Sequence, residues 1–149
     1  MKKSAFINKN NFYIFLLFFI SILINNHYAN LGALPIDTFY HFDLGFKILK
    51  GMVPFSDIWM VSGPVVNYIQ ALFFYVLGIN WLSYVLHASI FNCIITLSTY
   101  FLLKDFKINT NYCFIYSIFF AVLAYPSSGT PFVDHHSTFF LFWDFILFC

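Results

Sequence analysis

Three of the chain's six acidic residues lie on one short polar connection, "PIDTFYHFDLGFKILKGMVPFSD" at 35–57. Two carboxylates held at a membrane surface could serve a reaction on a lipid-linked phosphate. One would take a proton from an acceptor hydroxyl, and the other would orient a substrate or a cation. Asp37 and Asp57 are the candidates for these catalytic roles. The structural alternative is that Asp37 only caps a helix and Asp57 is a solvated loop residue.

A second polar group precedes the last apolar stretch. In "VDHHST", Asp134, His135 and His136 stand in a row. Adjacent histidines on a helix point about 100° apart and rarely bind one ion together, so we predict no metal site here. Asp134 and His135 are candidate substrate contacts, together with Lys50 and His41 of the first connection. No cofactor is predicted, and a divalent cation beside the acidic residues is left open.

The composition indicates that a membrane protein positions these groups. The 149 residues are 61% hydrophobic and 9% charged, with a mean hydropathy of +0.80. A soluble domain carries about 25% charged residues, so the expected solvent is the lipid bilayer. A net charge of +1 gives no basic patch for nucleic acid. Arginine is absent, so a phosphate would be held by Lys, His, hydroxyls or backbone N–H groups.

We therefore predict a single all-α domain over 1–149, a polytopic transmembrane bundle with an amphipathic interfacial helix. The expected helices cover 11–31, 38–50 (interfacial), 64–80, 82–103, 112–125 and 138–149. Lysines before the first stretch predict a cytoplasmic N-terminus. The membrane we expect is a bacterial inner membrane. A cleaved signal peptide is the competing interpretation, but His27 makes a poor cleavage site. His87 and Asn92 are expected to make interhelical hydrogen bonds.

The 38–50 segment is predicted to lie flat in the membrane surface. Its apolar stripe consists of Phe39, Phe42, Phe46 and Leu49. On the opposite face Asp43 and Lys47 form an i,i+4 pair. Gly45 weakens the helix by about 1 kcal/mol. Gly51 suits the position after its end.

The charged "KDFK" segment makes the topology ambiguous. If every apolar stretch crosses, Lys104 and Lys107 lie outside, against the tendency of basic residues to stay in the cytoplasm. The conflict disappears if 64–80 does not cross fully. Residues 31–63 and 126–137 then share the outer face.

A longer pattern extends from the first polar connection into the next apolar stretch. It begins with an Asp after the first helix and an amphipathic segment. The motifs G-x-x-P-[FY]-x-D and G-P-x-x-x-Y follow, and the second motif opens an apolar helix that ends in Gly. These positions are Asp37, Gly51, Pro54, Phe55, Asp57, Gly63, Pro64, Tyr68 and Gly78. The pattern resembles the N-terminal part of the GT-C superfamily of polytopic membrane glycosyltransferases, which includes protein mannosyltransferase and aminoarabinose transferase-like enzymes. The resemblance implies transfer of a sugar, with inversion, from a polyprenyl-phosphate donor on the extracytoplasmic face. It makes Asp37 the general base or acceptor contact and Asp57 the second acidic position.

Two departures qualify that resemblance. Members of the superfamily are several times longer, and this chain stops within the apolar run "FFLFWDFILFC", so we expect further C-terminal helices. The arginines and the Glu that many relatives carry near these motifs are absent. The alternative is a non-enzymatic module, such as a transporter or flippase-like helical fragment. A transporter should place polar residues near the bilayer midplane. Here only Asp144 lies so deep, and we expect it to face the bundle or to be protonated.

Overall fold

The computed structural model describes residues 9–31, 35–123 and 129–148, which form helices and no strand. The helices are α1 (Lys9–Ala29), α2 (Pro35–Leu49), α3 (Val65–Leu77), α4 (Trp81–Asp105), α5 (Thr110–Leu123) and α6 (Val133–Phe148). The all-α prediction is confirmed. Most helix ends lie within a few residues of their predicted positions, while α6 begins earlier, at Val133 instead of near position 138.

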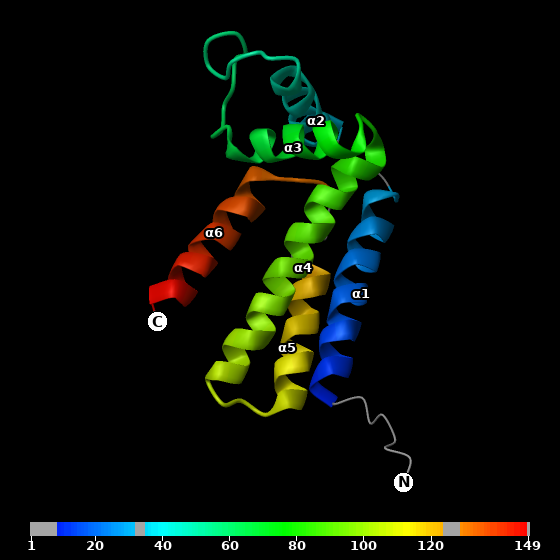
Figure 1. Cartoon of the computed structure of the whole chain (residues 1–149), viewed down its shortest axis with the longest axis vertical. Helices are drawn as coiled ribbons and strands as arrows, with labels where there is room; N and C mark the ends of the chain where they lie inside the picture. The colour runs from blue at the N-terminus through cyan, green and yellow to red at the C-terminus, as the bar shows by residue number, and fades with distance from the viewer. Residues whose placement is uncertain (1–8, 32–34, 124–128, 149) are drawn as a thin grey trace.

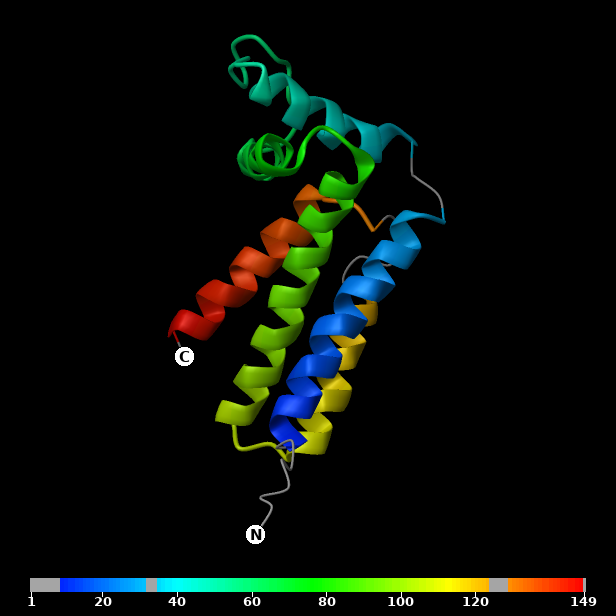
Figure 2. The ribbon, with the colours of Figure 1, turned by 45° about the vertical axis from the view of Figure 1, so that its right-hand side comes forward.

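Helices α1, α4 and α5 lie side by side along the long axis of the molecule (Figure 1). Helices α2 and α3 pack against each other across one end of α4, and α6 runs from that end and slants away (Figures 1 and 2). Among the described helices, α1 and α4 are long and apolar enough to cross a membrane, judged by length and composition. At 13 residues α3 measures about 20 Å, less than the roughly 30 Å of a bilayer's hydrocarbon core.

The two ends of the bundle differ in chemistry. We call the end covered by α2 and α3 the capped end. The opposite end, where α1 starts, α4 finishes and α5 starts, carries Lys9, Lys104 and Lys107, and we call it the basic end (Figure 1). This arrangement places the "KDFK" segment at the same end as the start of α1.

Apolar clusters and single polar links hold the three long helices together. Leu17, Tyr100 and Cys113 form one buried cluster between α1, α4 and α5. The Asn92 side-chain NH₂ donates to the carbonyl oxygens of Ser21 and Ala121, at 3.1 and 3.0 Å. The predicted interhelical role of Asn92 is therefore confirmed, and one amide joins α4 to both neighbours.

On the side that packs against the bundle, α2 buries residues that the predicted membrane-facing stripe does not include. Phe39 of the predicted stripe is 54% exposed, whereas His41, Leu44 and Gly45 are buried. A Cβ atom on Gly45 would lie 2.7 Å from Cγ of Gln70, so the glycine permits the close approach of α2 and α3. The local predictions are confirmed, since Lys47 Nζ lies 2.6 Å from Asp43 Oδ2 and the residue after Lys50 is a glycine with a φ of +89°.

Candidate functional site

Asp57 closes the loop in which it stands. Its carboxylate accepts from the Val53 backbone N–H at 2.8 Å (Oδ2) and from the Ser56 hydroxyl at 3.2 Å (Oδ1). Its own N–H donates to the Val53 carbonyl at 2.9 Å. Asp57 is exposed, and these contacts are the ones expected of a loop-closing residue.

Asp37 and Lys50 lie at opposite ends of α2. Asp37 belongs to the first turn, and its side chain falls outside the described part of the chain. Lys50 is exposed directly after the last turn, with Nζ 5.6 Å from the ring centroid of Phe46. At 1.5 Å per residue the helix separates the two positions by roughly 20 Å. The structure therefore does not bring Lys50 to the first turn. The later part of the loop that follows it reaches back along α2, where the Val61 N–H donates to the Tyr40 hydroxyl at 3.0 Å.

The start of α2 instead meets the segment before α6. The Thr38 and Thr130 hydroxyl oxygens lie 3.4 Å apart, and the rings of His41 and Phe132 are 5.8 Å apart between centroids. Position 37 therefore lies beside the segment that leads into α6. The two polar groups singled out in the sequence are thus neighbours at the capped end.

Asp134 and His135 occupy the first turn of α6. The Asp134 side chain is exposed, whereas His135 is half-buried. Burial lowers the pKa of His135, and the negative charge of Asp134 opposes that shift. His135 therefore favours its neutral form, which can both donate and accept a hydrogen bond.

A buried cluster of polar side chains, which we call the polar junction, lies behind these residues where α2, α3, α4 and α6 meet. None of its members is more than 4% exposed: Thr38, His41, Asn67, Gln70, Tyr84, His87, Thr130 and His136. The Tyr84 hydroxyl donates to the Thr38 carbonyl at 2.6 Å, and Nδ1 of His41 lies 2.9 Å from Oδ1 of Asn67. Each bond joins two different helices, so the junction fixes how α2 sits on the bundle.

The centre of the polar junction is a line of three side chains from three helices. Nδ1 of His87 on α4 lies 2.8 Å from Oε1 of Gln70 on α3. Nε2 of His87 lies 3.1 Å from Nε2 of His136 on α6. Nδ1 of His136 lies 2.8 Å from the Phe132 carbonyl oxygen. Burial lowers the pKa of His136 to about 4, so its neutral form predominates above that pH.

These contacts indicate where the hydrogens lie. The Phe132 carbonyl only accepts, so His136 carries its hydrogen on Nδ1. With both rings neutral, Nε2 of His87 donates to His136, and Nδ1 of His87 must accept from the Gln70 NH₂ group. When Oε1 of Gln70 faces Nδ1 of His87, as it does here, that nitrogen must carry a hydrogen as well. The His87–His136 pair then holds one proton more than two neutral rings. A half-turn of the Gln70 amide, whose Nε2 is buried without a hydrogen bond, accommodates either state.

The sequence did not predict the polar junction as a site. His87 was expected to make an interhelical hydrogen bond, which is confirmed, but its partners were unknown. His136 lies 49 positions further along the chain, and only packing brings the two rings together. The one available signal was the three-residue spacing of Asn67 and Gln70, which puts both amides on the same face of α3.

At the capped end the first turn of α2 thus lies next to the start of α6, above a buried network of imidazoles and amides. Among the described residues, no group of three His, Cys, Asp or Glu side chains is placed to hold a metal ion. The imidazoles and amides of this network can donate and accept hydrogen bonds, and the imidazoles can exchange protons. No protein-family model, no curated protein and no solved structure matches this chain.

Proposed function

We propose that this chain is a membrane-embedded module of a glycosyltransferase that takes a sugar from a polyprenyl-phosphate donor. The main support is an apolar groove of about 670 Å³ between α4, α5 and α6. Leu102, Phe119 and Phe142 are among its lining residues, and His135 and Thr138 line it on α6. A lipid-linked phosphate needs an apolar bed for its chain beside polar groups for its head, and this groove offers both.

In the proposed arrangement the prenyl chain lies in the groove with its phosphate near His135. The start of α2 borders the same end of α6 through the Thr38–Thr130 contact. Asp37 would then be positioned to accept the proton of an acceptor hydroxyl, with Asp134 as the second acidic residue. Asp57 and Lys50 stand at the far end of α2, and the proposal assigns Asp57 to loop closure.

The reaction balances with these groups alone. The acceptor oxygen forms a bond to the anomeric carbon of the sugar, while the bond from that carbon to the phosphate oxygen breaks. Attack from the face opposite the leaving group inverts the anomeric centre. Polyprenyl phosphate leaves with the bonding electrons, and the hydroxyl proton passes to the carboxylate of Asp37.

The proposal includes a polytopic arrangement in the membrane. Helices α1 and α4 would cross, α5 and α6 would be embedded beside them, and α2 and α3 would lie at the interface. The capped end would face the extracytoplasmic side, because Lys9, Lys104 and Lys107 lie at the other end, while Lys47 at the capped end is paired with Asp43. The substrate phosphate would then lie at headgroup level.

Binding is tested with a photoreactive polyprenyl-phosphate sugar in proteoliposomes of the whole chain. Cross-links should map to α4, α5 and α6, and excess polyprenyl phosphate should compete with them. Phe119→Trp, which fills the groove, should reduce labelling about tenfold. Leu72→Trp on the exposed side of α3 is the matched control and should not. Labelling spread over all helices without competition would contradict the binding mode.

Catalysis is tested separately, by release or transfer of radiolabelled sugar from the same donor. Asp37→Asn should lower the rate at least a hundredfold and leave cross-linking unchanged. Asp105→Asn, at the basic end, is the control for loss of a carboxylate. Binding without turnover in the unaltered chain would favour the alternative, a non-enzymatic membrane module.

A further inference from the structure

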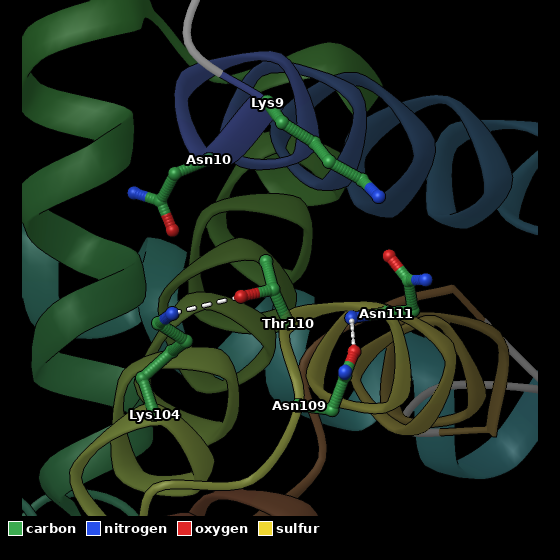
Figure 3. A pocket seen from close by; sticks show the side chains of 6 residues that line it. All are labelled: Lys9, Asn10, Lys104, Asn109, Thr110 and Asn111. Carbon is green, nitrogen blue, oxygen red and sulfur yellow. Dashed lines mark hydrogen bonds between the residues drawn. The ribbon is translucent and has the colours of Figure 1, made fainter.

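A second cavity, of about 620 Å³, lies at the basic end, remote from the polar junction (Figure 3). Its lining residues come from three segments far apart in the sequence: Lys9, Asn10, Lys104, Asn109, Thr110 and Asn111. They belong to the start of α1, the end of α4 and the connection into α5. Both charged residues among these six are lysines. Asp105, the neighbour of Lys104, is exposed and does not line the cavity.

The hydrogen bonds around the cavity occupy the oxygens of its lining residues. Oδ1 of Asn10 accepts from the Tyr100 hydroxyl at 2.7 Å, and Oδ1 of Asn111 accepts from the Tyr13 hydroxyl at 3.1 Å. Each amide therefore has an oxygen held by a tyrosine of the bundle. The NH₂ group of Asn111 is a donor that a ligand can use.

The remaining two oxygens are used within the lining itself. Oγ1 of Thr110 accepts from Nζ of Lys104 at 2.9 Å, and Oδ1 of Asn109 accepts from the Asn111 backbone N–H at 3.0 Å (Figure 3). All four side-chain oxygens that face the cavity thus have donors. What the cavity presents is two ammonium groups and amide N–H donors, and the N-terminus of α5 adds partial positive charge. A site of this kind matches an anion that only accepts hydrogen bonds.

We propose that this cavity binds a phosphate group, supplied by the headgroup of an anionic phospholipid. A phosphate diester offers several acceptor oxygens and one negative charge, which suits two lysines surrounded by donors. The ends of α1 and α4 lie at headgroup level if those helices span the bilayer. Free phosphate shares the same chemistry, and the experiment separates the two sources. The inference does not depend on the glycosyltransferase proposal, which concerns the other end of the bundle.

The test uses the whole chain in phosphatidylcholine nanodiscs containing one tenth phosphatidylglycerol. Native mass spectrometry counts the phosphatidylglycerol molecules that stay bound to the released protein. The double variant Lys9→Gln, Lys104→Gln should reduce this retention about fivefold for each lysine removed. Lys107→Gln is the control, because it removes a lysine from the connection that follows α4 without altering the lining, and it should change little.

Two further variants test the geometry with less risk to folding. Thr110→Val keeps both lysines but releases Nζ of Lys104, and it should weaken retention less than the double variant. Asn111→Asp introduces a carboxylate of nearly the same shape, and it should abolish retention. Circular dichroism confirms that each variant keeps its helix content.

The source of the phosphate is decided in nanodiscs made of phosphatidylcholine alone. Line broadening of inorganic phosphate in ³¹P spectra, lost in the double variant, would mean that the cavity takes free phosphate. Retention of phosphatidylglycerol that inorganic phosphate does not displace would identify the lipid. Equal losses in the double variant and in Lys107→Gln would overturn the proposal, as would the absence of binding in both arms.

Discussion

Nε2 of His87 lies 3.1 Å from Nε2 of His136, so a hydrogen bond between two imidazoles joins α4 to α6 at the capped end. Both rings are almost fully buried, and the outer nitrogen of each faces an oxygen, on Gln70 and on Phe132. Because both rings are buried, removing one of them leaves a nitrogen of the other without its hydrogen-bond partner. The contact should therefore matter for stability out of proportion to its size.

The first prediction concerns this pair. Phe has nearly the volume of His, so His87→Phe and His136→Phe each leave a buried ring nitrogen without its partner. Each should lower the free energy of unfolding by about 1–3 kcal/mol. The double variant should lose less than the sum, by about 1 kcal/mol, because the second change removes a group that is already unpaired. Denaturant unfolding in detergent micelles, followed by circular dichroism, measures all three.

His27→Phe serves as the control, because His27 is exposed on α1. It should leave the unfolding free energy nearly unchanged. Strict additivity of the two junction variants would show that the His87–His136 hydrogen bond does not form in the folded protein.

The second prediction is a pH dependence with a definite sign. Burial lowers the pKa of His136 to about 4, below the 6.5 of an unfolded histidine. Between these values the unfolded chain binds more protons than the folded one, so stability falls as the pH decreases. The stabilisation is complete above pH 6.5 and should decline by about 3 kcal/mol toward pH 4. Thermal melting in micelles at a series of pH values measures the decline.

His136→Gln should flatten that profile, since a glutamine occupies the position without titrating. The remaining slope would come from other groups, such as His135, whose pKa burial also lowers. A profile in the variant as steep as in the parent chain would assign the pH dependence elsewhere.

The third prediction tests the packing of α2 on α3. Alanine normally stabilises a helix interior by about 1 kcal/mol relative to glycine. At position 45, however, its Cβ would lie 2.7 Å from Cγ of Gln70, whose side chain is held by His87. Gly45→Ala should therefore destabilise the protein and lower its melting temperature. Gly63→Ala, which has open space around it, should be neutral, and a stabilised Gly45→Ala would show that α2 and α3 pack less closely.

The fourth prediction separates structure from catalysis at Asp57. Asp57→Asn keeps one oxygen for the Val53 N–H but removes the charge, whereas Asp57→Ala removes both oxygens. Hydrogen exchange of the Val53 amide should accelerate roughly two- to tenfold in Asp57→Ala, and less in Asp57→Asn. If Asp57 only closes its loop, sugar release should survive in Asp57→Asn. Loss of activity with slow Val53 exchange would restore its catalytic assignment.

The fifth prediction is the sidedness of the two ends. Single cysteines replacing Asp57, Asp105 and Asp134, all exposed, report on the capped and basic ends. In a chain whose native cysteines are changed to serine, an impermeant maleimide should label positions 57 and 134 from one face and 105 from the other. Labelling of 57 and 134 from opposite faces would mean that α3 crosses the membrane.

Asp144 illustrates a limit of reasoning from depth alone. Its position within an apolar run led us to expect a side chain facing the bundle. The structure places it on the exposed side of α6, away from the described helices. A carboxylate at that depth is costly in lipid, but the direction in which it points depends on how α6 is rotated.

Local spacing in the sequence was enough to determine the helices, the Asp43–Lys47 pair and the turn at Gly51, because each depends on residues within about one helical turn. The apolar composition predicted a polytopic bundle, and two of the described helices are long and apolar enough to span a membrane. Neither signal specifies which helix faces which.

Only the tertiary structure decided the contacts that give the two ends their chemistry. The same holds for the residues that α2 presents to α3, where Gly45 permits the close approach to Gln70 and Phe42 packs edge-on against Phe74. His87 meets His136 across 49 positions, and Tyr100 holds Asn10 across 90. Such pairs form because the helices pack at particular rotations and heights. Those are set by the summed fit of many side chains and leave no periodic trace in the sequence.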